Sequence, residues 1–268
     1  MRLLIVNPNT SEGVTDRIAA AAEAVAGPGD VFTTRSAAFG PPLIVTPQDA
    51  AEAVEGVLAT LRAHAGAVDG IVLGSFGDTG AEEVRALRPG LPVVGLAGAA
   101  FAAARALGGP VGIVTFGARL APSLREMAEA QGLGARLVGV AALSDGDAGD
   151  PATVQERCAD GLARLSREMA EAGAASIVLG GGPLAGLART IGPAVPVPVI
   201  DGVQAAVGLL RSAVSERRPA AGPRPAQGAT LEGEAGAPGA AAAGQAVGPG
   251  RAASLDQRGE VADEEVAR

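Results

Sequence analysis

The sequence predicts an α/β fold of two pseudo-symmetric halves, each a four-stranded parallel sheet flanked by helices, with a cleft between the halves. Short runs of β-branched and leucine residues alternate with alanine-rich segments of helical periodicity over residues 1–216. The strand-like runs are apolar throughout, which is typical of parallel strands covered by helices on both faces. Several of these runs also recur about 106 residues further along the chain, which indicates a duplicated unit.

The elements follow one another in a regular order. The candidate strands are short apolar runs bounded by turn residues, at Leu3–Val6, Val31–Thr34, Gly70–Leu73, Pro92–Gly95, Val111–Thr115, Arg136–Val140, Ser176–Leu179 and Val197–Ile200. The candidate helices repeat apolar residues at three- and four-residue spacing, at Ser11–Ala26, Pro47–Ala65, Ala81–Leu87, Ala99–Leu107, Ala118–Gln131, Pro151–Ala172, Leu184–Ile191 and Val203–Ser215. One helix start is well marked, because Thr46 can cap it and Pro47 suits the first helical position.

Three pairs of segments carry the duplication. They are Leu4–Val6 with Gly112–Val114, Ile71–Gly74 with Ile177–Gly180, and Pro92–Val94 with Pro198–Ile200. We expect two Rossmann-like halves, residues 1–97 with 203–216 and residues 98–202. Ligands bind at the carboxyl ends of parallel strands, so the loops that begin at Gly74 and Gly180 are expected to face one shared cleft.

The composition excludes several classes of protein. All 21 basic residues among the 268 are Arg, with one Cys (Cys158) and one His (His64). The absence of Lys excludes Schiff-base and pyridoxal chemistry and the P-loop lysine. A single Cys and a single His exclude disulfide frameworks and multi-histidine metal sites. We expect Cys158 to pack within a helix and His64 to lie away from the cleft, and we expect neither cofactor nor metal.

Charge and hydropathy indicate which classes of binding partner the protein has. The formal net charge is −8, which argues against a nucleic-acid partner. The first apolar run is too short for a signal peptide, and no stretch has the pattern of a membrane helix. We therefore expect a cytoplasmic protein with a small-molecule ligand and no membrane partner. Residues 217–268 are rich in Ala, Gly and Pro and poor in large apolar residues, so we expect a disordered tail there.

The loop from Gly74 to Gly80 carries the richest chemistry in the chain. Its glycines let backbone approach a ligand closely. Ser75 can bind a ligand through its hydroxyl or, if activated, exchange a proton, but neither His nor Lys is near in sequence to activate it. Asp78 is interpreted as a loop cap or as a general acid or base. The matching loop at Gly180–Pro183 offers only backbone N–H groups, as an anion nest or a tight turn.

Two further strand ends carry polar residues. Asn7–Ser11 follows the first strand and opens the first helix, so its side chains can grip a carboxylate or imide, form a turn with an N-cap, or do both. Thr115 ends the strand that mirrors the first one and is expected to line the cleft. Asp201 ends the last strand, and a cap of the final helix is favoured over a place in the cleft.

Four motifs resemble the aspartate/glutamate/hydantoin racemase superfamily, and the hydantoin racemase branch most. They are Asn7–Ser11, Phe76–Asp78 with Gly80, Val178–Gly180 with Ala185–Leu187, and Ile200–Val203. The resemblance covers about residues 1–215. It implies a cofactor-independent isomerase in which two cysteines, one from each half, act on opposite faces of a carbon acid, and it implies a homo-oligomer. In this sequence the two cysteine positions align with Ser75 and Gly181, so both thiols are replaced.

The two-thiol mechanism is therefore excluded by composition, because a serine hydroxyl does not ionise near neutral pH without help and glycine has nothing to ionise. Three functions stay open. They are an amino-acid or hydantoin isomerase with altered chemistry, a lyase or hydrolase at the same site, and a non-catalytic small-molecule-binding protein. The expected catalytic residues are Ser75 and Asp78, and the expected substrate-binding residues are Asn7, Asn9, Thr10, Phe76, Thr115, Gly181 and Gly182.

Overall fold

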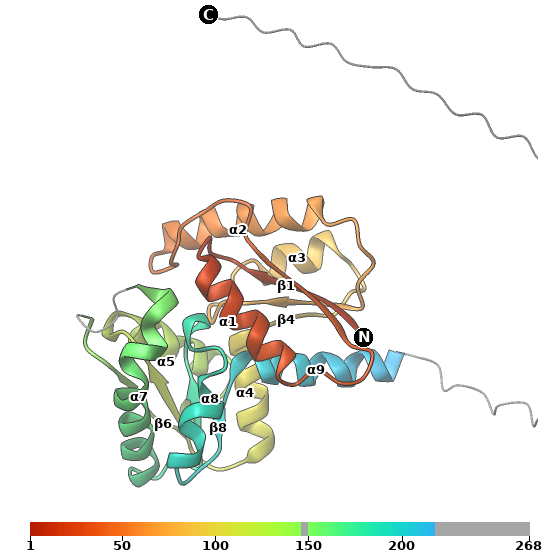
Figure 1. The fold of residues 1–268 in the computed structure, drawn as a ribbon. Helices are drawn as coiled ribbons and strands as arrows, with labels where there is room; N and C mark the ends of the chain where they lie inside the picture. The colour runs from red at the N-terminus through yellow and green to blue at the C-terminus, as the bar shows by residue number, and fades with distance from the viewer. Residues whose placement is uncertain (146–149, 218–268) are drawn as a thin grey trace, which may run out of the picture. The chain divides into compact units, whose positions relative to one another are not determined.

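The computed structural model describes residues 1–145 and 150–217 and contains two four-stranded parallel sheets (Figure 1). The first sheet has the order β2-β1-β3-β4 and the second the order β6-β5-β7-β8. The strands are β1 (Arg2–Asn7), β2 (Val31–Ser36), β3 (Gly70–Leu73), β4 (Val93–Gly95), β5 (Val111–Thr115), β6 (Leu137–Ala142), β7 (Ser176–Leu179) and β8 (Val199–Ile200). Every strand pair is parallel, so the predicted fold class is confirmed.

Every predicted helix is present, with changes at the ends. The helices are α1 (Glu12–Glu23), α2 (Pro47–Ala63), α3 (Ala81–Leu87), α4 (Leu96–Leu107), α5 (Ala121–Ala130), α7 (Val154–Glu171), α8 (Leu187–Ile191) and α9 (Gly202–Arg217). The predicted cap of α2 is a full capping box, in which Thr46 Oγ1 accepts from the Asp49 amide and the Asp49 carboxylate accepts from the Thr46 amide. Of the tail expected over residues 217–268, the structure describes only Arg217, which ends α9; the rest lies outside the described residues. None of the described helices combines the length and the hydropathy needed to cross a membrane.

Helices cover both faces of each sheet, which explains why the inner strands β1 and β5 are mainly apolar and buried, whereas the edge strand β2 carries Thr, Arg and Ser. In β1, Leu4 and Val6 join the core cluster beneath α2 and α3, whereas Leu3 and Ile5 join the cluster shared with α1 and α9. All four side chains are buried. Because alternate residues of a strand point to opposite faces, a strand covered on both sides needs apolar residues at every position.

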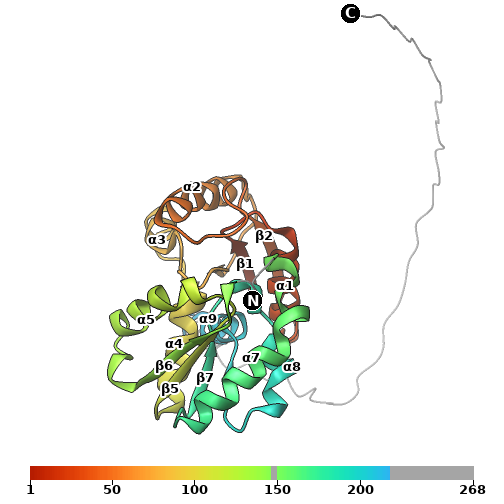
Figure 2. The ribbon, with the colours of Figure 1, turned by 90° about the vertical axis from the view of Figure 1, so that its left-hand side faces the viewer.

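The helices α4 and α9 connect the two halves. Helix α4 follows the first sheet in sequence but packs on β7 and β8 of the second, whereas α9 ends the described chain and packs on β3 and β4 of the first. The two helices also pack against each other, and Figure 2 shows them at the centre, where the two sheets meet. Phe101 of α4 is fully buried there and makes an edge-to-face contact with Phe76, with ring centroids 5.7 Å apart. A continuous core therefore holds the facing loops in place.

The internal repeat extends to single hydrogen bonds. The Gly74 amide donates to the Val6 carbonyl at 2.7 Å, and the Gly180 amide donates to the Val114 carbonyl at 2.9 Å. Each bond ties the end of a central strand to the first residue of a glycine-rich loop. The two loops consequently leave their sheets at corresponding points, and the fold is pseudo-symmetric.

Candidate active site

A cavity of about 310 Å³ lies at the carboxyl ends of the strands, between the two glycine-rich loops. Ser75 and Gly181 both line it. The loops approach so closely that a Cβ added to Gly182 would lie 2.7 Å from the Gly74 carbonyl oxygen. The full lining is Asn9, Leu43, Ile44, Val45, Thr46, Pro47, Ala50, Gly74, Ser75, Phe76, Gly77, Thr79, Phe116, Leu120, Ser123, Leu124, Met127, Gly180, Gly181, Gly182 and Pro183. Two positions about a hundred residues apart thus share one pocket.

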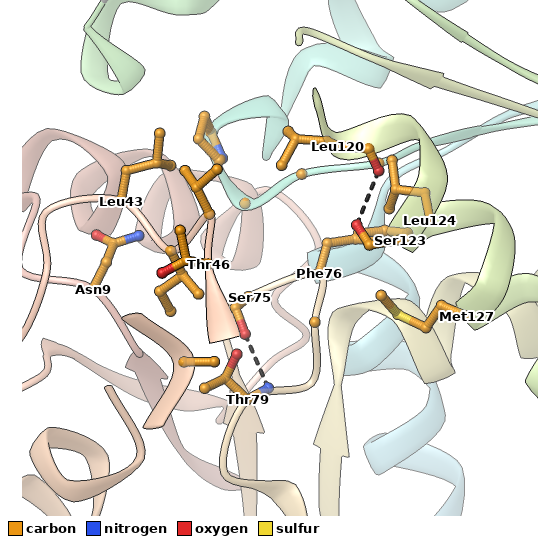
Figure 3. A pocket seen from close by; sticks show the side chains of 18 of the residues that line it. Asn9, Leu43, Thr46, Ser75, Phe76, Thr79, Leu120, Ser123, Leu124 and Met127 are labelled. Atoms are coloured by element: carbon orange, nitrogen blue, oxygen red, sulfur yellow. Dashed lines mark hydrogen bonds between the residues drawn. The ribbon is translucent and has the colours of Figure 1, made fainter. Parts of the chain in front are cut away.

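The described residues that line this cavity include none with a charged side chain. Figure 3 shows the hydroxyls of Ser75 and Thr79 and the amide of Asn9 on the side of the first half. The wall from the second half carries Leu124 and Met127 of α5. Burying an ion in such surroundings is costly, so the pocket suits an uncharged ligand with both polar and apolar groups.

Ser75 is half-buried, and its Oγ accepts a hydrogen bond from the Thr79 amide at 3.1 Å (Figure 3). With its oxygen engaged as an acceptor, the hydroxyl hydrogen is left for a ligand or a water molecule. The side chains that line the cavity include no carboxylate, imidazole, thiol or amine. The Ser75 hydroxyl can therefore act as a hydrogen-bond donor, and the lining supplies no neighbour that would activate it as a base.

The two loops also contribute backbone donors. The N–H groups of Ser75, Phe76, Gly181 and Gly182 donate to no acceptor within residues 1–145 and 150–217. All four residues line the cavity. Unpaired backbone amides cost little when a bound oxygen can accept from them, and they stabilise a developing oxyanion. The pocket can thus bind carbonyl oxygens from two sides without any cationic side chain.

Asn9, Ser75, Phe76, Gly181 and Gly182 lie at the pocket as expected, but three other predicted binding residues do not. Asn7 is fully buried, and its amide nitrogen donates to Asn9 Oδ1 at 2.8 Å and to Thr15 Oγ1 at 3.0 Å. Its side chain completes the turn that places Asn9 at the cavity. The structure thus places Asn7 behind the cavity lining and not in it.

Thr10 and Thr115 also lie outside the cavity lining, where each side chain or amide holds a neighbouring loop. The Thr10 amide donates to the Pro41 carbonyl at 3.1 Å, so Thr10 fastens the loop between β2 and α2. Thr115 is fully buried and its hydroxyl donates to the Gly180 carbonyl at 2.6 Å. The prediction that Thr115 lines the cleft is wrong, because its side chain instead ties β5 to the start of the second loop.

Asp78 points away from the cavity. Its two carboxylate oxygens accept from the amides of Ala97 and Gly98, at 2.9 and 3.0 Å, at the start of α4. Burial raises the pKa of the Asp78 carboxyl above its usual value, although the hydrogen bonds from the two amides oppose the rise. Of the two interpretations of Asp78, the structure shows the cap, and the side chain is absent from the pocket lining.

Asp201 has the matching role in the second half. Its Oδ1 accepts from the Val203 amide at 2.9 Å and its Oδ2 from the Gly186 amide at 2.5 Å. It thus caps α9, as favoured from the sequence, and ties that helix to the segment that follows the second glycine-rich loop. In each half, a carboxylate therefore joins the segment after the third strand to the helix after the fourth.

The apolar lining was missed by sequence reasoning. Leu43, Ile44 and Val45 lie in the loop between β2 and α2, and Leu120 and Leu124 lie at the start of α5. The first set did carry a signal, namely an apolar run between Pro42 and Pro47 that no predicted strand or helix claimed. Cys158 is buried in α7, and His64 follows the last residue of α2; neither lines the cavity. The described residues contain no group of three His, Cys, Asp or Glu side chains placed to hold a metal.

Comparisons with known proteins agree with this architecture. A family model described as Asp/Glu/Hydantoin racemase matches residues 3–210. The hydantoin racemase of Paenarthrobacter aurescens is 31% identical over 226 residues, which cover 80% of this chain and 92% of that protein. The structure of allantoin racemase from Klebsiella pneumoniae superposes with a TM-score of 0.71 at 36% identity, covering 81% of this chain and 88% of the other. The allantoin racemase of Pseudomonas fluorescens gives a TM-score of 0.72 at 30% identity, covering 81% and 92%.

Proposed function

The chain belongs to the Asp/Glu/hydantoin racemase family, and on this premise we propose that its cleft binds a small uncharged cyclic imide of the hydantoin class. The proposed reaction is exchange of the hydrogen on the ring carbon that bears the substituent. The relatives that resemble the chain are named for hydantoin and for allantoin, and both compounds contain the same five-membered imide ring. We propose that this exchange reaction needs no cofactor.

The observation that carries the proposal is the uncharged lining of the pocket. A free amino acid would bring an ammonium and a carboxylate group into a cavity whose described lining offers no opposite charge. An imide ring brings neutral carbonyl and N–H groups instead. Its carbonyl oxygens match the unpaired amides of Ser75, Phe76, Gly181 and Gly182 and the hydroxyl hydrogen of Ser75. The pocket favours the ring over the open-chain acid for this reason.

The same amides support the chemistry. Removing the hydrogen beside a carbonyl leaves an enolate, whose negative charge sits largely on the carbonyl oxygen. Backbone N–H groups that donate to that oxygen stabilise the enolate, and the loss of one such donor typically slows a reaction by about 100-fold or more. Ser75 binds the ligand or an ordered water on one face. Asp78 has no part in this step, since its carboxylate is occupied at α4.

Hydrogen exchange in deuterated water tests the proposal. We expect the protein to speed deuterium incorporation into 5-isopropylhydantoin, followed by mass spectrometry, and to leave valine unlabelled. Ser75→Ala should lower the exchange rate roughly tenfold or more, because one donor at the reacting carbon is lost. Ser212→Ala, which changes an exposed serine of α9, is the matched control. Labelling of valine in preference to the hydantoin would contradict the proposal.

One observation favours a second function, a ligand-binding protein without turnover. The described lining contains no ionisable side chain, so the protein itself supplies no strong base. In that case 5-isopropylhydantoin would raise the melting temperature with no deuterium incorporation above the rate in buffer. Turnover of the ring without exchange would instead point to the lyase or hydrolase.

We also propose a cytoplasmic location and a homo-oligomer. The first follows from the sequence pattern and the second from the family resemblance. Cell fractionation tests the location, and light scattering coupled to gel filtration tests the oligomeric state. A monomer at micromolar concentration would contradict the second proposal.

A further inference from the structure

The two faces of the pocket differ at the positions that the family resemblance assigns to the two thiols. Position 75 carries a hydroxyl with the Thr79 amide behind it. Position 181 carries no side chain, and the space beside it is already filled. A Cβ added to Gly181 would lie 2.7 Å from Phe116 Cε1 and 3.2 Å from Phe116 Cδ1. The Phe116 ring therefore occupies the place where a second acid or base would stand.

The backbone at Gly181 fits this arrangement. Its φ angle of +150° with ψ of 135° lies in a region that residues with a Cβ rarely adopt. Glycine is thus required by the loop as well as by the Phe116 ring. The second face is closed by two independent features, the conformation of the loop and the position of the ring.

The surroundings of the two faces also differ in polarity. Phe116 is 3% exposed and packs in the core cluster that contains Leu184 and Leu187. Ser75 is half-buried, and Figure 3 shows its hydroxyl near that of Thr79, opposite the apolar side chains of Leu124 and Met127. A water molecule that carries protons needs polar partners. On the Ser75 side these partners are the hydroxyls of Ser75 and Thr79, whereas the Gly181 side presents the Phe116 ring, and the Ser123 hydroxyl of the second half already donates to the Leu120 carbonyl.

We infer that the site works on one face only: Phe116 closes the Gly181 face of the bound ring, so the hydrogen exchanges on the Ser75 side and returns there with retention of configuration. The inference rests on the proposed function and makes Phe116 a specificity-determining residue. In the step, a hydroxide ion from solvent, hydrogen-bonded to Ser75, takes the proton as the C–H bond breaks. The electron pair moves to the carbonyl oxygen. The resulting water, after exchange with solvent, returns a deuteron to the same face.

The experiment uses the full chain and separate enantiomers of 5-isopropylhydantoin in deuterated water. Mass spectrometry measures label, chiral chromatography measures configuration, and the melting temperature reports binding; a sample without protein corrects for spontaneous exchange. For one enantiomer we expect roughly ten or more hydrogen–deuterium exchanges for each inversion of configuration. We expect its mirror image, whose hydrogen faces Phe116, to exchange at the buffer rate. Equal exchange and inversion of both enantiomers would overturn the inference and leave the proposed function standing.

Variants of Phe116 make the test sharper. Phe116→Ala opens the Gly181 face to water, so the ratio of exchange to inversion should fall to about one. Phe116→Leu keeps an apolar side chain there and should retain most of the selectivity. Phe39→Ala removes a phenylalanine that is 49% exposed and outside the pocket lining, and it should leave the ratio unchanged. An unchanged ratio in a folded Phe116→Ala protein would overturn the inference.

Two results separate failure of the inference from failure of the proposed function. Thermal stabilisation by the hydantoin without exchange of either enantiomer would refute one-faced exchange while supporting a binding role. Neither stabilisation nor exchange would refute the proposed function itself, and the inference with it. The melting temperature therefore decides which of the two has failed.

Discussion

Replacing Asp78 tests how the first glycine-rich loop is held against the rest of the fold. Its carboxylate accepts from two backbone amides at the start of α4, and the residue has a φ of +49°. Asn tolerates this left-handed conformation best after Gly, whereas Ala does not. Asp78→Ala therefore removes both acceptors and adds backbone strain, whereas Asp78→Asn keeps one oxygen and the favoured conformation.

The magnitude follows from these contacts. Two part-buried amides that lose their acceptors cost about 1–2 kcal/mol each, so Asp78→Ala should lower the free energy of unfolding by about 2–4 kcal/mol. Asp78→Asn should lower it by about 1–2 kcal/mol, because one hydrogen bond survives. Since burial raises the pKa of Asp78, a neutral side chain is tolerated there better than a truncated one.

Urea unfolding followed by circular dichroism measures both variants. With a slope of about 2 kcal/mol per M, the midpoint should move by about 1–2 M for Asp78→Ala and by about half as much for Asp78→Asn. Asp16→Ala, which removes an exposed carboxylate from α1, is the control and should change little. If Asp78→Ala unfolded at the same urea concentration as this control, the capping argument would be wrong.

Three further predictions concern stability. The Asp30 carboxylate accepts a hydrogen bond from the Arg211 guanidinium. Burial raises the pKa of the Asp30 carboxyl, but the hydrogen bonds from Arg211, the chain's amino terminus and the Gly27 amide outweigh burial and hold the pKa well below its usual range. Its stabilising effect should thus be present above about pH 4 and lost as the pH falls further, so unfolding free energy should drop less steeply below pH 4 in Asp30→Asn than in the parent. Gly181→Ala should lower the unfolding free energy by about 1–3 kcal/mol, because the new Cβ meets Phe116 and the φ is unfavourable; a urea midpoint equal to the parent's would contradict this. Gly208→Ala, at an exposed position of α9 with open space around it, should raise the melting temperature by a few degrees, in line with roughly 0.5–1 kcal/mol of helix stabilisation, and a fall would refute the assumption of open space.

The fold was predictable because the repeat and the hydrophobic periodicity agree. The strands at Gly70–Leu73, Val111–Thr115 and Ser176–Leu179 have the bounds expected from sequence. Helix ends were harder to place. Helix α8 begins only at Leu187, because Pro183 and the left-handed Gly186 place a 3₁₀ turn and a bend before it. Such choices depend on backbone angles that local composition does not set.

The loops that form the site could be predicted from the sequence, but the directions of their side chains could not. Ser75 and Gly181 could be placed at one pocket because strand ends of related halves meet there. Thr115 instead donates to the Gly180 carbonyl, a contact between β5 and the loop after β7 that the order of residues does not reveal. The same holds for Asp78, whose carboxylate reaches α4 through a left-handed turn. The sequence shows which residues follow a strand, but tertiary packing decides where they point.

Helix α4 packs on the second sheet and α9 on the first, and this crossed packing has a consequence for biosynthesis. The first sheet is complete in sequence by Gly95, yet on one face the strands β3 and β4 are covered by α9, which spans Gly202–Arg217. A growing polypeptide on the ribosome thus exposes the apolar residues of that part of the sheet until more than a hundred further residues have been made. Translation must run nearly to the end of the described chain before either half can reach its native form.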